Sequence, residues 1–277
     1  MVELDFGCIP NLKHIFECGQ CFRWEAEPLS DKAAEADGSY IGVVGDEVVR
    51  ASVCGSKVIL EGTDNAEFWA DYFDVSFDYE SVKAKFNKDK TLKSCMEYGY
   101  GIRILKQDLF ETVISFIISA NSNIPKIKST IEKLCKLAGT RLRDGYYMFP
   151  TAEQIVTVGV EKLRLTGAGY RCKYIFQTAL AVANGEINLE NLREAPTDSA
   201  KNELIKLPGV GDKVANCILL FGLHRFDTFP IDVWVKRLMD NAYGVAEKDI
   251  SKFSVENFGE YRGLAQQYLF YYHRGKN

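Results

Sequence analysis

The strongest indication of chemistry is a lysine and an aspartate nineteen positions apart, Lys213 and Asp232. We expect Lys213 to begin a helix after a Leu-Pro-Gly-Val-Gly turn. At that position the helix dipole disfavours an ammonium ion and leaves a neutral amine, the form that a nucleophile needs. Asp232 follows Pro230-Ile231 and should begin another helix, where its carboxylate could support a reaction at the lysine. A surface lysine and a simple helix cap are the structural alternatives.

The turn before Lys213 is a candidate phosphate contact. Pro208 ends one predicted helix, Gly209 and Gly211 allow a tight turn, and Asp212 could cap the helix that follows. Uncovered backbone N–H groups at a helix N-terminus bind phosphate. A turn of this kind alone is often a plain connection between helices, but its combination with the lysine and with the later Pro-Ile-Asp segment is more specific.

This combined segment, residues 207–238, resembles the helix-hairpin-helix DNA glycosylases, and among them most closely the 8-oxoguanine DNA glycosylases. The resemblance covers most of the chain, because four further motifs occur in family order: Gly19–Trp24, Ser119–Ile124, Gly167–Arg171 and Leu264–Phe270. It implies a base-excision repair enzyme that flips 8-oxoguanine out of duplex DNA and cuts its glycosidic bond. It also implies that Lys213 is the catalytic nucleophile, that Asp232 is its catalytic partner, and that abasic-site cleavage by β-elimination can follow.

The same resemblance implies a pocket for the flipped base. The Lys213–Cys217 pair would stack on one face of the base and Phe270 would cover the other, and Gln266 would hydrogen-bond its edge. The carbonyl of Gly19 would accept the N7–H that 8-oxoguanine has and guanine lacks, and Pro230 would also line the pocket. A buried acceptor left facing the guanine lone pair costs about 1–3 kcal/mol, which would provide discrimination. Core packing or a turn is the alternative for each residue.

Further residues are implied to contact DNA. Asn121 would enter the gap left by the extruded base, Tyr170 would act as a wedge, and Arg171 would read the opposite cytosine. Lys126 stands where better-known members have an arginine, and Trp234 where they have a histidine near a phosphate. The implied set is completed by Gly209, Gly211 and Val214. Taken alone, Asn121 could equally end a helix, and Arg171 and Lys126 could be solvated charges.

The elements around these residues predict an α+β fold. Short β-branched runs separated by turn residues predict a small antiparallel sheet near the N-terminus, with strands at 21–24, 40–44, 47–53 and 57–61. An aspartate and a glutamate at 108 and 111 predict a capping box before an apolar helix. Further helices are expected at 126–138, 151–158, 173–183, 199–206, 213–223, 231–241 and 258–271. We expect a sheet domain over 1–98 and a helical body with the active-site cleft over 99–277.

Charge is distributed unevenly. The net charge of −4 is unusual for a DNA-binding protein, but residues 24–80 carry 14 acidic and 3 basic side chains, whereas residues 81–277 carry 29 basic and 21 acidic ones. The helical body can therefore present a basic surface to DNA.

The remaining features point to a monomeric intracellular protein that binds double-stranded DNA and no membrane. No segment is long and apolar enough to span a bilayer, and the first thirty residues lack a secretion leader. The eight cysteines should mostly be buried thiols, including the Cys18-x-x-Cys21 pair, for which zinc or redox chemistry is the alternative. No cysteine follows Cys217, which excludes a C-terminal iron–sulfur cluster. We expect no cofactor and no metal site. The sequence leaves open whether a monovalent cation binds to the hairpin carbonyls.

Two other functions remain possible on sequence grounds. A monofunctional glycosylase for alkylated bases has the aspartate without the lysine nucleophile. A non-catalytic helix-hairpin-helix module needs the hairpin glycines, but neither Lys213 together with Asp232 nor a base pocket.

Overall fold

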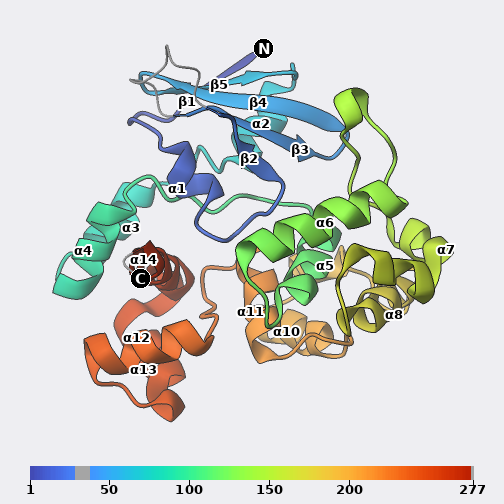
Figure 1. The fold of residues 1–277 in the computed structure, drawn as a ribbon. Helices are drawn as coiled ribbons and strands as arrows, with labels where there is room; N and C mark the ends of the chain where they lie inside the picture. Colours follow the sequence, from blue (N-terminus) through green and yellow to red (C-terminus); the bar gives the residue numbers. More distant parts are fainter. Residues whose placement is uncertain (29–37, 276–277) are drawn as a thin grey trace.

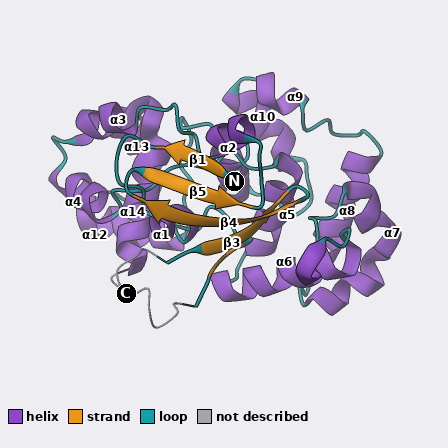
Figure 2. Ribbon diagram, turned by 90° about the horizontal axis from the view of Figure 1, so that it is seen from above, coloured by secondary structure: helices purple, strands orange, loops and turns teal. Residues whose placement is uncertain are grey.

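The computed structural model describes residues 1–28 and 38–275. A five-stranded antiparallel sheet lies across two groups of helices, one containing α3, α4 and α12–α14 and the other α5–α11 (Figures 1 and 2). The fold is therefore α+β, with the sheet at the N-terminus as expected. No helix among the described residues is long and apolar enough to cross a membrane.

The sheet has the strand order β1-β5-β4-β3-β2. Its strands are β1 (Val2–Asp5), β2 (Trp24–Ala26), β3 (Tyr40–Val44), β4 (Glu47–Cys54) and β5 (Lys57–Glu61). The alternating runs predicted β3 and β5 at their observed bounds. The strand expected at 21–24 is wrong in position, because it begins at Trp24, where pairing with Gly42 starts. The short strand β1 was missed.

One face of the sheet packs on aromatic side chains from α1 (Leu12–Phe16) and α2 (Ala66–Tyr72). The rings of Phe16 and Trp24 stack with their centroids 4.1 Å apart, and Trp24 is 1% exposed. Gly42 makes this packing possible, because a Cβ there would lie only 2.3 Å from the Trp24 ring. The sheet thereby forms its own apolar core.

The second core is helical. Its helices are α3 (Tyr79–Phe86), α4 (Lys90–Tyr98), α5 (Leu109–Ser119), α6 (Ile124–Ala138), α7 (Ala152–Leu163), α8 (Arg171–Ala183), α9 (Asn191–Glu194), α10 (Thr197–Ile205), α11 (Asp212–Phe221), α12 (Val233–Tyr243), α13 (Ile250–Phe258) and α14 (Arg262–Gly275). Short 3-10 turns lie at Arg143–Gly145, Arg164–Thr166, Glu247–Asp249 and Gly259–Tyr261. Although α3 and α4 lie within residues 1–98, their buried side chains belong to this core. The division at residue 98 stays a prediction.

Helix α5 is the buried centre of the second helical group. It packs against α6, α8 and α11, and most of its side chains are buried. Asp108 caps its N-terminus by accepting a hydrogen bond from the Glu111 amide at 2.7 Å. The expected apolar helix is therefore confirmed, with the aspartate half of the expected capping box in place.

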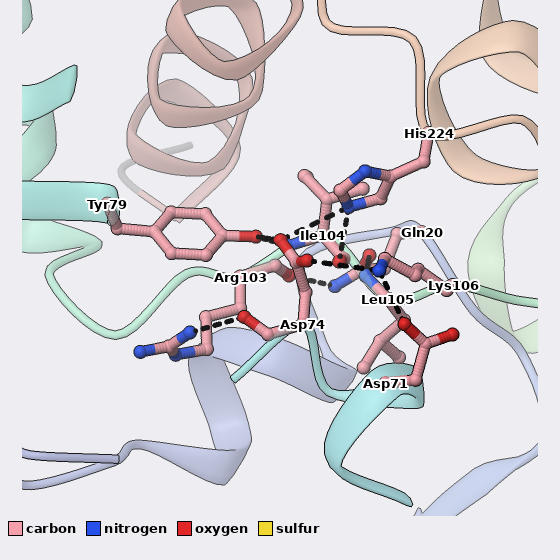
Figure 3. Close-up of polar contacts among 9 residues, drawn as sticks. All are labelled: Gln20, Asp71, Asp74, Tyr79, Arg103, Ile104, Leu105, Lys106 and His224. Atoms are coloured by element: carbon pink, nitrogen blue, oxygen red, sulfur yellow. Dashed lines mark hydrogen bonds and ion pairs between the residues drawn. The ribbon is translucent and has the colours of Figure 1, made fainter. Parts of the chain in front are cut away.

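A buried polar network connects the sheet side of the molecule to the loop after α11 (Figure 3). The Asp74 carboxylate accepts a hydrogen bond from the Tyr79 hydroxyl at 2.9 Å and lies 3.3 Å from His224 Nε2 and 3.6 Å from Lys106 Nζ. Burial raises the pKa of Asp74, but the hydrogen bonds and charges of these partners outweigh it and lower that pKa below 3.8. The network thus holds an ionised carboxylate between the two parts of the fold.

Candidate active site and DNA-binding surface

The turn between α10 and α11 has the geometry of a helix-hairpin-helix motif. Gly209 has φ +84°, and a Cβ there would lie 2.7 Å from the Tyr174 ring. Gly211 is exposed, precedes α11 and has open space where a side chain would project. The expectation that Asp212 caps α11 is wrong. Asp212 is already the first helical residue, and its carboxylate instead pairs with Lys201 at 2.6 Å. The backbone amides at this helix start remain uncovered by a capping side chain.

Lys213 lies in the first turn of α11, one helical turn before Cys217. Its ammonium group is 5.6 Å from the centroid of the Phe116 ring of α5. The pKa of the Cys217 thiol is raised, mainly because the thiol is buried. The charge of Lys213 and its hydrogen bond to the thiol lower this pKa, whereas the charge of Asp232 raises it. These couplings place the expected nucleophile, its partner and one face of the expected base pocket together.

Asp232 is the N-cap of α12. Its Oδ1 accepts a hydrogen bond from the Val235 amide at 2.8 Å, and buried Pro230 lies two residues before it. The loop that delivers Asp232 packs against the start of α14, where a Cβ on Gly263 would lie 3.0 Å from the Phe226 and Thr228 carbonyls. The capping role is therefore present, and it leaves the second carboxylate oxygen available to the site.

The two ends of the chain meet beside this centre. Gly19 has φ +90°, and a Cβ there would lie 3.3 Å from Phe270 Cε1 and 3.2 Å from Arg274 Nη1, both on α14. Gln266, one helical turn before Phe270, is 5% exposed, and its Oε1 is buried without a hydrogen-bond partner among the described residues. The structure thus places Gly19, Gln266 and Phe270 on neighbouring elements, although they lie far apart in the sequence.

Gln20 fixes the loop that carries Gly19. Its amide donates a hydrogen bond to the Arg103 carbonyl at 2.7 Å, and its Oε1 accepts one from the Leu105 amide at 2.9 Å (Figure 3). The same amide also donates a hydrogen bond to the Ile15 carbonyl at 2.8 Å. The Gln107 amide binds the Gln20 carbonyl at 2.9 Å and the Phe221 carbonyl at 3.3 Å. The Gly19 loop is thereby joined to the end of α11. Sequence analysis missed this role of Gln20, although the residue lies within a recognised motif.

Two aromatic rings connect the Gly19 loop to Lys213. The Phe22 and Phe116 centroids are 5.7 Å apart, and the Phe116 ring also carries the Lys213 contact. Gly19 further lines a cavity of about 860 Å³ between the sheet and α6, whose lining residues do not include Lys213. That one cavity holds Gly19, Phe270 and Lys213 together therefore stays a prediction.

The residues expected to insert into DNA also lie together. Asn121 lies two residues after the end of α5, has φ +50° and is exposed, and Tyr170 is 57% exposed. The Arg171 guanidinium donates hydrogen bonds to the Ala120, Asn121 and Ala168 carbonyls at 2.7, 2.9 and 3.0 Å. In this structure Arg171 therefore supports the Asn121 loop, and it is 8% exposed. It is a buried anchor here and not the solvated charge that was one alternative.

The remaining expected DNA contacts differ in exposure. Lys126 is exposed, and its Nζ lies 3.0 Å from the position of a Cβ on Gly167. Trp234 is 49% exposed beneath the Arg237 guanidinium, which lies 5.8 Å from its ring centroid. Val214 is 6% exposed, so a DNA contact there would come from its backbone.

The cysteine pair Cys18 and Cys21 is buried. Burial raises the pKa of Cys18 to about 11 and that of Cys21 well above its ordinary value. Both thiols therefore stay protonated at neutral pH. Among the described residues, no group of three or more histidine, cysteine or acidic side chains is arranged to hold a metal ion.

Comparisons with known proteins agree with this arrangement. Residues 9–113 match the model of the 8-oxoguanine DNA glycosylase N-terminal domain, and residues 114–259 match that of the HhH-GPD superfamily base excision DNA repair protein. The N-glycosylase/DNA lyase of Saccharomyces cerevisiae is 38% identical over 263 residues, which cover 85% of this chain and 69% of the relative. The N-glycosylase/DNA lyase OGG1 of Arabidopsis thaliana is 30% identical over 284 residues, with 92% and 75% covered.

Solved structures show the same fold. The Clostridium acetobutylicum 8-oxoguanine glycosylase/lyase, in complex with double-stranded DNA containing cytosine opposite 8-oxoguanine, superposes with a TM-score of 0.90 at 40% identity. The match covers 97% of this chain and 93% of that one. The chain belongs to the HhH-GPD superfamily of base excision DNA repair proteins, in the family that carries the 8-oxoguanine DNA glycosylase N-terminal domain.

Proposed function

We propose that this protein is a bifunctional DNA glycosylase and abasic-site lyase that removes 8-oxoguanine from duplex DNA. The observation that carries the proposal is the position of Lys213 in the first turn of the hairpin helix, one turn before Cys217, whose thiol pKa is affected by the charges of both Lys213 and Asp232. The contact of Gly19 with Phe270 at the side of this centre supports an oxidised purine as the substrate. The relatives named above, which are glycosylases with lyase activity, support the same reaction.

The first step is displacement of the base by an amine. The neutral Nζ of Lys213 attacks C1′ of the flipped nucleotide, the C1′–N9 bond breaks, and its electron pair leaves with the base, which then takes up a proton. The free carboxylate oxygen of Asp232 stabilises the positive charge that develops on the sugar. The attacking nitrogen becomes positively charged when its bond to C1′ forms and then loses one proton, so the product is a neutral secondary amine joined to C1′.

The second step cuts the strand. The C1′ adduct opens to a Schiff base, which makes the C2′ proton acidic. Loss of that proton expels the 3′ phosphate by β-elimination. Borohydride reduces the Schiff base to a stable amine, so it captures the enzyme on its DNA.

DNA binding would use two surfaces. The uncovered amides of the hairpin, around Gly209 and Gly211, suit a phosphate group. The group formed by Asn121, Lys126 and Tyr170 suits the gap in the duplex and the base opposite it. We propose that the reaction needs no bound cofactor, because the lysine and the carboxylate suffice for it. We also propose that the protein acts as a monomer, in the compartment that holds the cell's DNA.

Borohydride trapping on duplex DNA with one 8-oxoguanine tests the proposal. The unsubstituted protein should be trapped and should cut the strand, whereas Lys213→Gln should bind the same duplex without trapping or cutting. Lys252→Gln, which removes an exposed lysine from α13, is the control and should behave like the unsubstituted protein. Base excision that persists in Lys213→Gln would favour a monofunctional glycosylase. Binding with no excision by the unsubstituted protein would favour a non-catalytic module.

A further inference from the structure

Arg274, in the last turn of α14, has a guanidinium group that is only partly used. Its Nη2 donates a hydrogen bond to the Glu17 carbonyl, at the start of the Gly19 loop. Its Nη1 is buried and has no hydrogen-bond partner among the described residues. A buried donor of a permanent cation without an acceptor is unfavourable, so the atom requires an explanation.

The residues around Nη1 indicate which molecule could supply the missing hydrogen-bond acceptor. Nη1 lies 3.2 Å from the position of a Cβ on Gly19, and the guanidinium carbon is 5.6 Å from the centroid of the Phe270 ring. These two neighbours are the residues expected to hold the N7 edge and one face of the flipped base. Arginine has only donors, so the partner must be an oxygen or nitrogen acceptor.

The chemistry of the base supplies such an acceptor. In 8-oxoguanine the N7–H lies between two carbonyl oxygens, one at C6 and one at C8. A carbonyl of Gly19 that accepts from N7–H would bring both oxygens close to the neighbouring side chains. A donor placed beside Gly19 would therefore face one of them.

We propose that Arg274 is a specificity-determining residue, which donates a hydrogen bond from Nη1 to a carbonyl oxygen flanking N7 of the flipped oxidised purine. This inference rests on the proposed function. Negative charge spreads onto these oxygens when the C1′–N9 bond breaks, so the cation also stabilises the leaving base. Arg274 stays protonated throughout, and no proton is transferred to or from it. Purines with a carbonyl next to N7 form the substrate class that this contact favours.

Equilibrium binding tests the contact in proteins that also carry Lys213→Gln, which prevents cleavage. Two duplexes are compared, one with 8-oxoguanine and one with a tetrahydrofuran abasic analogue, which has no base. Arg274→Met should weaken binding to 8-oxoguanine about ten- to a hundredfold, the range for a lost hydrogen bond from a charged group. Binding to the tetrahydrofuran duplex should change by less than about twofold, the scatter expected where no contact is lost. Arg262→Met, at the other end of α14, removes the same charge and should change neither affinity.

Three outcomes would overturn the inference. Equal losses on both duplexes would mean that Arg274 only anchors the Glu17 loop, and unchanged affinity for 8-oxoguanine would mean that Nη1 does not touch the base. Excision of 8-oxoguanine by the unsubstituted protein is measured in parallel. Its absence would refute the proposed function and this inference together, whereas normal excision with either of the first two results would refute only the role of Arg274.

Discussion

Replacing Gly19 with alanine should damage base recognition more than folding. Gly19 has φ +90°, a conformation that side-chain-bearing residues rarely adopt, and an added Cβ would press on Phe270 and Arg274 at 3.3 and 3.2 Å. Both contacts are with the ends of side chains, which can move by a few tenths of an ångström. The backbone therefore dominates the loss of stability, whereas the displaced side chains affect the pocket.

The two effects have different sizes. A left-handed conformation costs an alanine about 1–2 kcal/mol, and for a chain of this size each kcal/mol lowers the melting temperature by roughly 2–4 °C. Displacing the Gly19 carbonyl loses one buried hydrogen bond to the base, about 1–3 kcal/mol. Excision of 8-oxoguanine should therefore fall about 5- to 150-fold, since 1.4 kcal/mol corresponds to a tenfold change.

The measurement is single-turnover excision together with thermal melting, with Gly45→Ala as the matched control. Gly45 also has positive φ, +59°, but it lies in the β3–β4 turn with nothing within 4 Å of the added Cβ. Gly45→Ala should lose similar stability and excise at the normal rate. A normal rate in Gly19→Ala would remove Gly19 from the pocket, and an equal loss of rate in Gly45→Ala would show that stability alone sets the effect.

Three more changes are informative. Asp232→Asn should lower single-turnover excision about a hundredfold or more while the melting temperature holds, because the amide oxygen can still cap α12; equal losses of rate and stability would indicate a cap only. Lys126→Arg should sharpen the preference for cytosine opposite the lesion by roughly 1–3 kcal/mol, measured as excision on the four duplexes, since a guanidinium can bind a base edge in two places. A preference above about a thousandfold before substitution would contradict this reasoning. Asp74→Asn should destabilise the protein by about 1.5–3 kcal/mol at neutral pH. Because the folded pKa of Asp74 is lowered from 3.8, its contribution is full above that pH and is lost as the pH falls below it, so melting curves of the two proteins should converge in acid.

Local sequence patterns predicted the strands and helices whose formation depends on residues close together in the chain. The period-two runs located β3 and β5, and the apolar stretch after Asp108 located α5. The position of Lys213 relative to Cys217 follows from one helical turn, so the structure could only agree with it.

Features that depend on contacts between residues far apart in the sequence could not be predicted from local patterns. Helices α3 and α4 were assigned to the sheet domain, yet they bury their apolar faces against the helical core. Arg171 reads in the sequence as an available cation, but three backbone carbonyls around Asn121 bind its guanidinium. Arg274 gives no signal at all, because its importance comes from a loop some 255 residues away.

Helix α14 contributes to the active site at two places, and it is synthesised after the other parts of that site. The hairpin, Lys213 and Asp232 all emerge from the ribosome before Gln266, Phe270 and Arg274. A nascent chain whose hairpin has just emerged therefore still lacks α14, against whose start the loop before Asp232 packs. A chain interrupted before Arg262 would lack both the support of the Asp232 loop and the residues expected to select the base. Positioning of Asp232 and selection of the base would therefore depend on the same helix.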